Sequence, residues 1–306
     1  MVEPLIPFSP MEPKSFKEAF DDPNYGFQIK WDGVRILAHI NEGKIELFNR
    51  KKNIRTKQYP EIVSALPQIF KKNVILDGEM ITLQRGKPSF SQLIRRDFAT
   101  DIKTIKKLTE KIPITYVVFD ILYNDVNDLT NEPFNIRDKL LKSLIKPMES
   151  IVVTDTFPYK GKGLFSVIKE AELEGIVAKK LDSNYQIGKK SSSWLKIKNW
   201  RTLNTFIGGY LTEGIEIRSL YLGTFENGDF VYIGRAGSGI NRQQSLELFE
   251  SLQNSISVNC PFVNQPAVAK SENPTWVNPS IEVIIKYMDF TDDGHIRHPV
   301  IKKVLL

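Results

Sequence analysis

The sequence predicts an α+β protein in which a mixed domain of strands and helices precedes a smaller β-barrel domain. Through residue 200, short runs rich in Val, Ile, Phe and Tyr alternate with amphipathic stretches. After Thr202, strand-like runs joined by glycine-containing turns predominate. The 306 residues are enough for two domains that each bury a hydrophobic core. We place the boundary near Trp200–Leu203 and expect domains 1–200 and 201–306.

The expected strands of the first domain are β-branched and aromatic runs bounded by Gly, Asp, Asn or Lys. They are Phe27–Trp31, Val34–Ile40, Ile45–Phe48, Val74–Leu76, Ile114–Leu122, Ile151–Thr154, Gly175–Lys180 and Trp194–Lys198. Helices are expected at Ile102–Lys111, at Asn135–Ile145 after Pro133, and at Leu164–Leu173. Proline suits a helix start, because its missing N–H has no partner there in any case.

The second domain reads as a strand meander with one helix. Strands are expected at Phe206–Leu211, Ile217–Phe225 and Asp229–Arg235, the last two joined by an Asn227-Gly228 turn. The helix is Arg242–Leu252. A loop rich in Pro and Asn follows, and the last expected strand is Ile281–Phe290. Short strands with a single helix in a segment of this size favour a small β-barrel.

Composition narrows the class of protein. Hydrophobic residues make up 41% and charged residues 25%, which is ordinary for a globular protein, and no apolar run approaches the ~18 residues that span a bilayer. The N-terminus has no signal-peptide pattern, and a single cysteine, Cys260, excludes a disulfide framework. We therefore expect a cytoplasmic protein with no membrane association. The net charge of +6 favours polyanionic partners.

The segment that points to chemistry is Lys30-Trp31-Asp32-Gly33-Val34-Arg35. It places a lysine at the end of one strand, before an Asp-Gly turn in which Gly33 would let the backbone pass close to a ligand. An unprotonated amine can attack the α-phosphorus of a nucleoside triphosphate, and desolvation or a neighbouring cation favours that form. Taken alone, the same segment also fits a hairpin with a solvated lysine.

This hexapeptide resembles the nucleotidyl-lysine motif of the covalent nucleotidyltransferases, which comprise DNA ligases, RNA ligases and mRNA capping enzymes. Further motifs of that superfamily follow in order. They are Leu47-Phe48-Asn49-Arg50, Leu76-Asp77-Gly78-Glu79, Tyr116–Leu122, Glu174-Gly175-Ile176-Val177-Ala178-Lys179 and Trp194-Leu195-Lys196-Ile197-Lys198. The joint occurrence of these motifs favours the functional interpretation over surface charges and core packing.

The resemblance implies that Lys30 carries the nucleotide as a covalent adduct. It also implies nucleotide contacts for a larger group, namely Gln28, Ile29, Arg35, Arg50, Glu79, Phe119, Val177, Lys196 and Lys198. Within this group Phe119 stacks on the base, and Glu79 contacts the ribose. Glu79 and Glu174 are the expected metal ligands, for Mg²⁺ or alternatively Mn²⁺. The resemblance also implies phosphate contacts: Arg35 and Arg50 for the nick phosphate, Lys196 and Lys198 for the α-phosphate.

The second half resembles the ATP-dependent DNA ligases of bacteria and phages, and in particular the ligase domain of ligase D. Gly234–Ile240, Trp276-Val277-Asn278-Pro279 and Thr291–Pro299 carry this resemblance. It implies an ATP-grasp-like nucleotidyltransferase (adenylation) domain, with antiparallel sheets and flanking helices, followed by an OB-fold. Two departures stand out. Gln28 occupies the place of a glutamate that reads the adenine amino group, and Lys302 and Lys303 lie where an R-x-D-K motif is expected.

The expected function is therefore that of an ATP-dependent DNA ligase, which seals 5′-phosphate/3′-hydroxyl nicks through lysyl-AMP and a DNA-adenylate. The expected partners are nicked duplex DNA and, by analogy with ligase D, a Ku-like end-binding protein. We expect a monomer in a bacterial cytoplasm or nucleoid, or in a phage-infected cell. Rival interpretations are an RNA ligase or GTP-using capping enzyme, and a non-catalytic nucleic-acid-binding protein on a decayed ligase scaffold.

Overall fold

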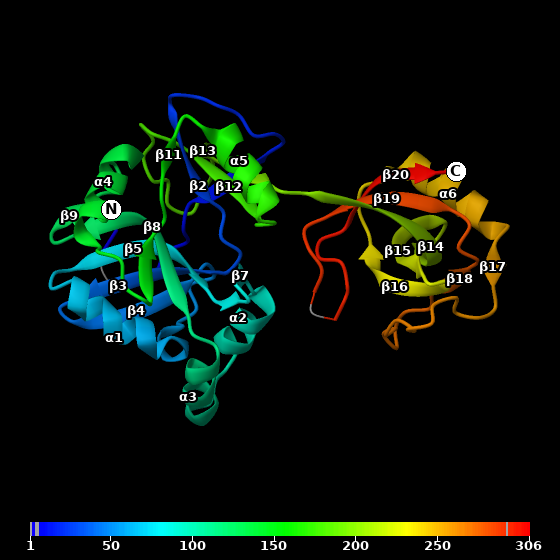
Figure 1. Cartoon of the computed structure of the whole chain (residues 1–306), viewed down its shortest axis with the longest axis horizontal. Coiled ribbons are helices and arrows are strands. Elements are labelled where there is room, and N and C mark those ends of the chain that lie inside the picture. Colours follow the sequence, from blue (N-terminus) through cyan, green and yellow to red (C-terminus); the bar gives the residue numbers. More distant parts are fainter. Residues whose placement is uncertain (1, 4–5, 292) are drawn as a thin grey trace. The chain divides into compact units, whose positions relative to one another are not determined.

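The computed structural model describes residues 2–3, 6–291 and 293–306, so Asp292 of the C-terminal pattern lies outside the described residues. The chain separates into two compact units, Met1–Asn199 and Trp200–Leu306. The first unit combines sheets with several helices, and the second consists of sheet with one long helix (Figure 1). Among the described residues, no helix is long and apolar enough to cross a membrane.

The larger sheet of the first unit carries one half of the site. Its order is β10-β8-β5-β3-β4, with β9 paired to β8. These strands are β3 Val34–Asn41, β4 Lys44–Asn49, β5 Val74–Ile81, β8 Thr115–Asn124, β9 Asn127–Asp128 and β10 Ile151–Val153. On β3, Ile36 and Ala38 face one hydrophobic cluster and Leu37 faces another, as the two-residue period of a strand requires.

Helices flank this sheet, and a short hairpin lies beside it. The elements are the 3₁₀ turn η1 Thr56–Gln58, α1 Pro60–Ile69, α2 Phe90–Asp97, α3 Ile102–Lys111, α4 Phe134–Leu144, and the two-stranded β6 Leu83–Gln84 with β7 Lys87–Pro88. The α1 helix contributes Ile62 and Leu66 to the main core, and α4 contributes Leu141. These contacts cover the sheet face that lies opposite the pocket described below.

The smaller sheet carries the other half of the site. Its order is β1-β13-β12-β2-β11, formed by β1 Glu12–Phe16, β2 Tyr25–Ile29, β11 Phe157–Pro158, β12 Gly175–Lys180 and β13 Lys190–Lys198. Helix α5 Gly161–Glu170 packs on its outer face through Leu164 and Ile168. Met11 and Trp194 pack against Leu37, Ile75 and Leu122 of the larger sheet, so the two sheets are joined by a shared apolar cluster.

The second unit is a β structure with one long helix. Its sheet begins with a meander of three strands, β14 Arg201–Glu213, β15 Glu216–Glu226 and β16 Asp229–Ala236. Four shorter strands complete the sheet, namely β17 Ile256–Ser257, β18 Thr275–Val277, β19 Glu282–Tyr287 and β20 Val300–Leu305. The helix is α6 Arg242–Gln253. The first half of β14 pairs with β19 and the second half with β18. A long strand shared in this way bends the sheet toward closure, as in small barrels.

The fold class predicted from sequence is confirmed, and several element boundaries differ from expectation. The expected 175–180 strand and 102–111 helix match β12 and α3. The Asn227-Gly228 turn has positive φ at both residues, as a two-residue hairpin turn of this kind requires. Helices α1 and α2 were not expected, since α1 contains Pro67 and α2 is short and rich in charge. The 281–290 strand is not the last, because β20 follows it.

Candidate active site

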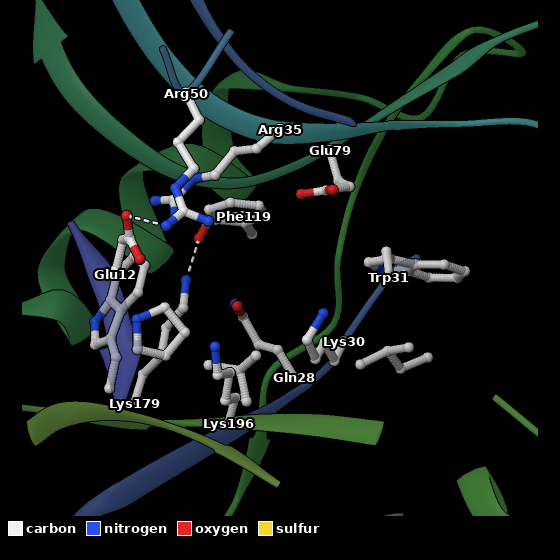
Figure 2. Close-up of a pocket in the computed structure, with 14 residues that line it drawn as sticks. Glu12, Gln28, Lys30, Trp31, Arg35, Arg50, Glu79, Phe119, Lys179 and Lys196 are labelled. Atoms are coloured by element: carbon white, nitrogen blue, oxygen red, sulfur yellow. Dashed lines mark hydrogen bonds and ion pairs between the residues drawn. The ribbon is translucent and has the colours of Figure 1, made fainter. Parts of the chain in front are cut away.

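An open pocket lies where the two sheets of the first unit meet, and both sheets contribute side chains to it (Figure 2). The lining residues are Glu12, Pro13, Gln28, Ile29, Lys30, Trp31, Arg35, Arg50, Glu79, Phe119, Val177, Lys179, Trp194 and Lys196. Cationic, acidic and aromatic groups therefore share one cavity. Such a lining suits a ligand that has an aromatic end and an anionic end.

Lys30 follows β2 directly, and its backbone N–H donates to the carbonyl of Gly175 at 2.9 Å. This bond fixes the base of the side chain against β12. The Lys30 Nζ donates to Glu174 Oε2 at 2.5 Å, and Lys198 Nζ lies 3.7 Å from the other oxygen of the same carboxylate. Glu174 thus bridges two lysines at the edge of the pocket, and the Lys30 amine is held with a proton acceptor beside it.

Gly33 is required by the fold rather than by a ligand. A Cβ at this position would lie 2.1 Å from the carbonyl oxygen of Met80 and 2.9 Å from Glu79 Cγ. The close approach that the sequence predicted for Gly33 is therefore to β5 of its own sheet. By allowing this contact, Gly33 brings the Lys30 segment next to the strand that carries Glu79.

Glu79 is half-buried on the pocket wall. Burial raises the pKa of its carboxyl to about 8, against the opposing effect of the cations Lys30 and Arg35, while the nearby carboxylate of Glu174 raises it further. Two carboxylates that sense each other in a partly desolvated site are a donor set that favours a hard, oxygen-preferring cation. The expected metal ligands Glu79 and Glu174 thus both interact with Lys30.

Arg35 is held by a bidentate pair with Asp77, at 2.9 Å from Nε and 2.5 Å from Nη2. Tyr185 donates its hydroxyl proton to the same carboxylate at 2.7 Å. Although burial opposes the charge of Arg35, its pKa is raised by Asp77 and Tyr185. The guanidinium carbon lies 5.3 Å from the centre of the Phe119 ring, so Arg35 is fixed over the aromatic wall of the pocket.

A buried lysine lies against Phe119. Lys179 Nζ is 4.6 Å from the centre of the Phe119 ring, 4.0 Å from that of Trp194, and donates to the Phe119 carbonyl at 2.9 Å. Figure 2 shows this side chain reaching the backbone of Phe119. The bond and the ring contacts fix the position of the phenylalanine that the sequence predicts to stack on a base.

The remaining cations lie on strand ends around the pocket. Lys196 and Lys198 are two residues apart on β13 and so project from the same face, but only Lys196 lines the pocket. Burial lowers the pKa of Lys196, and the positive charges of Lys30 and Lys198 lower it further. Arg50 forms an ion pair with Glu12 at 2.5 Å and keeps a 62% exposed side chain. The ion pair with Glu12, which lies on the other sheet, places the Arg50 guanidinium at the pocket.

The structure thus brings together almost all of the residues that the sequence singled out. Gln28, Ile29, Lys30, Arg35, Arg50, Glu79, Phe119, Val177 and Lys196 line the pocket, whereas Glu174 and Lys198 lie beside it through their contacts with Lys30. Sequence reasoning missed the contributions of Glu12, Pro13, Trp31, Lys179 and Trp194. Trp31, Lys179 and Trp194 belong to the recognised motifs, so motif membership was a usable signal for them. Glu12 and Pro13 carried no such signal.

Comparison with known proteins decides the family. A family model described as ATP dependent DNA ligase domain matches residues 10–198, and one described as ATP dependent DNA ligase C terminal region matches residues 213–304. The chain belongs to the ATP-dependent DNA ligases. A crystal structure of the ligase domain of Mycobacterium tuberculosis LigD superposes on this ligase with a TM-score of 0.59 and 28% identity, covering 97% of this chain and 95% of that one.

Curated relatives agree with the family assignment. The multifunctional non-homologous end joining DNA repair protein LigD of M. tuberculosis is 30% identical over 278 residues, which are 89% of this chain and 35% of that protein. The chain thus spans about a third of the length of that relative. An SPbeta prophage-derived DNA ligase-like protein of Bacillus subtilis is 33% identical over 215 residues, 70% of this chain and 75% of that protein.

Proposed function

We propose that this ligase seals 5′-phosphate/3′-hydroxyl nicks in duplex DNA with ATP, through an AMP adduct on Lys30. The observation that supports this is a nucleophilic amine, held by Glu174, that shares one pocket with an aromatic ring and with the cations Lys196 and Arg50. The first unit would act as the adenylation domain. The second would act as an OB-fold domain that contacts nucleic acid.

In the first step Lys30 Nζ forms a bond to the α-phosphorus of ATP, and the bond from that phosphorus to the pyrophosphate oxygen breaks. The ammonium must first lose a proton, and Glu174 Oε2, at 2.5 Å, is the acceptor within reach. Lys196 would hold the α-phosphate, with Lys198 behind it. Phe119 would stack on the base, which would lie among Ile29, Val177 and the Gln28 amide. Glu79 would bind the ribose.

In the second step a 5′-phosphate oxygen displaces the lysine and takes the AMP, which forms a DNA-adenylate. In the third step the 3′-hydroxyl displaces AMP and closes the backbone. Arg35 and Arg50 would hold the nick phosphate. Asp77 pre-orients Arg35, so little rotamer entropy is lost when it binds. Positioning and charge stabilisation supply most of the rate in such a site.

Glu79 and Glu174 would hold Mg²⁺ or Mn²⁺, because their oxygens are the ligands such ions prefer. A cation would also offset the cost of a negative charge on the buried Glu79 carboxylate. A bound ion supplies neutralisation of phosphate charge. Lys302 and Lys303 would supply point charges in place of the R-x-D-K motif. Both are exposed on β20, and the register slips by one residue at Lys302, so the usual alternation of neighbouring side chains between opposite faces is interrupted there.

We further propose that the ligase acts as a monomer in the cytoplasm, with nicked duplex DNA as partner, and that a Ku-like protein delivers it to DNA ends. The Ku proposal rests on the similarity to LigD, which is named for end joining. The proposal implies that less of the ligase is recruited to blunt DNA ends when the Ku-like protein is withheld.

The test of the proposed function is labelling with α-³²P-ATP or α-³²P-GTP and a divalent metal, followed by denaturing electrophoresis. We expect an AMP adduct that is lost in Lys30→Ala, retained in the control Lys44→Ala, and discharged by nicked DNA. Lys44 is a suitable control because its side chain is 64% exposed on a distant hairpin. A GMP adduct instead would support the capping-enzyme alternative. Binding of nicked DNA with no adduct, and with no sealing of pre-adenylylated nicks, would support the non-catalytic one.

A further inference from the structure

Gln28 is bound on its buried side by a chain of hydrogen bonds that no recognised motif includes. Its Nε2 donates to Thr156 Oγ1 at 2.9 Å, and the Thr156 hydroxyl donates to Asp138 Oδ1 at 2.8 Å. Lys142 Nζ binds the second oxygen of Asp138 at 2.7 Å, one helical turn along α4. Gln28 and Asp138 are 2% and 8% exposed, so this chain runs through the protein interior.

The chain has a fixed direction. A carboxylate only accepts hydrogen bonds, so the single hydroxyl proton of Thr156 is committed to Asp138. The Thr156 oxygen can then only accept from Gln28, and the amide must turn its NH₂ group toward Thr156. The Gln28 carbonyl oxygen is left on the side of the pocket, which Gln28 lines. A flipped amide would set two acceptors against each other at Thr156 and turn its NH₂ group toward the pocket.

We propose that Thr156 and Asp138 are positioning residues for base selection, because they hold the Gln28 amide with its acceptor toward the nucleobase. This inference rests on the proposed function of the pocket. An acceptor at this place matches the 6-amino group of adenine and repels the 6-oxo group of guanine. A carboxylate would present an acceptor in either orientation, whereas an amide selects adenine only when its orientation is fixed.

The local packing supports this assignment. A Cβ on Gly26, two residues before Gln28 on β2, would lie 2.5 Å from Thr156 Cγ2. The absence of a side chain at Gly26 therefore lets Thr156 approach the strand closely enough to bind Gln28. Thr156 itself lies between β10 and β11, two segments that belong to different sheets. Its hydroxyl thus links the pocket wall to helix α4.

The test is the ratio of kcat/KM for self-adenylylation with ATP to that for self-guanylylation with GTP. The ratio is independent of the fraction of protein that is folded, so partial misfolding of a variant cancels. We expect Thr156→Val and Asp138→Asn to reduce the ratio about tenfold, because one orientation-fixing hydrogen bond is lost. Thr156→Ser, which keeps the hydroxyl, should retain the wild-type ratio.

A second set of variants, made in Gln28→Glu, distinguishes a loss of amide orientation from a general structural effect of Thr156→Val. In Gln28→Glu, the side chain has an acceptor at both oxygens, and adding Thr156→Val should leave the ratio within about twofold. An equal fall of the ratio in both backgrounds would overturn the proposal, as would an unchanged ratio in Thr156→Val. If the wild-type protein formed no nucleotide adduct, the proposed function would fail. Adduct formation with an unaltered preference in Thr156→Val would refute the positioning role alone.

Discussion

The buried ammonium of Lys179 leads to a prediction about how the stability of the first unit depends on pH. Only 2% of the residue is exposed, and burial lowers the pKa of its amine to about 7 from an ordinary 10.5. Arg137 lowers it further, whereas Asp120, Asp77 and Asp138 act in the opposite direction. Between pH 7 and 10.5 the unfolded lysine therefore binds a proton that the folded one lacks.

The sign and size follow from proton linkage. Since the unfolded lysine binds more protons in this window, the contribution of Lys179 to the free energy of unfolding rises with pH from about 7 and levels off near 10.5. At ~1.4 kcal/mol per pH unit, the full shift corresponds to at most about 5 kcal/mol, and the part between pH 7 and 9.5 to about 3 kcal/mol. Lys179→Met removes the titrating group and fills similar volume, so its stability should lack this rise.

Urea unfolding of wild type and Lys179→Met at several values between pH 6 and 9.5 measures the difference. We expect the variant to gain most over wild type at or below pH 7, and this advantage to shrink steadily above it. Lys44→Met, at an exposed position, controls for general effects of charge removal. Parallel curves would refute the reasoning. They would mean that the contacts with Trp194 and Phe119 keep the folded lysine charged throughout.

Three further predictions concern the frame of the site and the helix of the second unit. Arg137→Met should destabilise the first unit by about 3–5 kcal/mol in urea unfolding, because it leaves the fully buried Asp120 carboxylate without its bidentate partner; a double variant with Asp120→Leu should recover part of this loss. Gly33→Ala should abolish the AMP adduct even where circular dichroism shows folded protein, since its Cβ collides with the Met80 carbonyl; an active variant would contradict this. Asn241→Ala should cost about 1 kcal/mol by hydrogen exchange in α6, whose capping box it removes, and should leave α4 unchanged.

The resemblance to the covalent nucleotidyltransferases implied that the motif residues meet at one nucleotide site, whereas the strand pattern predicted only local features. Lys196 and Lys198 had to share a face, and Lys30 had to lie at a strand end before a turn. The register between strands was not predictable, since it depends on contacts between distant segments. It is the register that places Gln28 opposite Val177 and Arg35 opposite Glu79.

The residues that sequence reasoning missed act mainly through long-range contacts. Thr156 reaches Gln28 across 128 positions of sequence, and Tyr185 reaches Asp77 across 108. Neither threonine nor tyrosine carries a local signal of such a role, because each residue type occurs in many structural contexts. Their partners decide their function, and partners become visible only when the sheets are paired.

The Asp77-Gly78-Glu79 segment shows how one motif divides between chemistry and architecture. Asp77 and Glu79 project from the same face of β5, where the first holds Arg35 and only the second reaches the pocket. Gly78 faces the other side, where a Cβ would lie 2.6 Å from the Tyr116 ring and from the Val117 carbonyl. The positions of neighbouring groups therefore account for Asp77 and Gly78, whereas Glu79 is available for the proposed nucleotide. Substituting Asp77 should disturb catalysis through Arg35 without any contact of its own with the nucleotide.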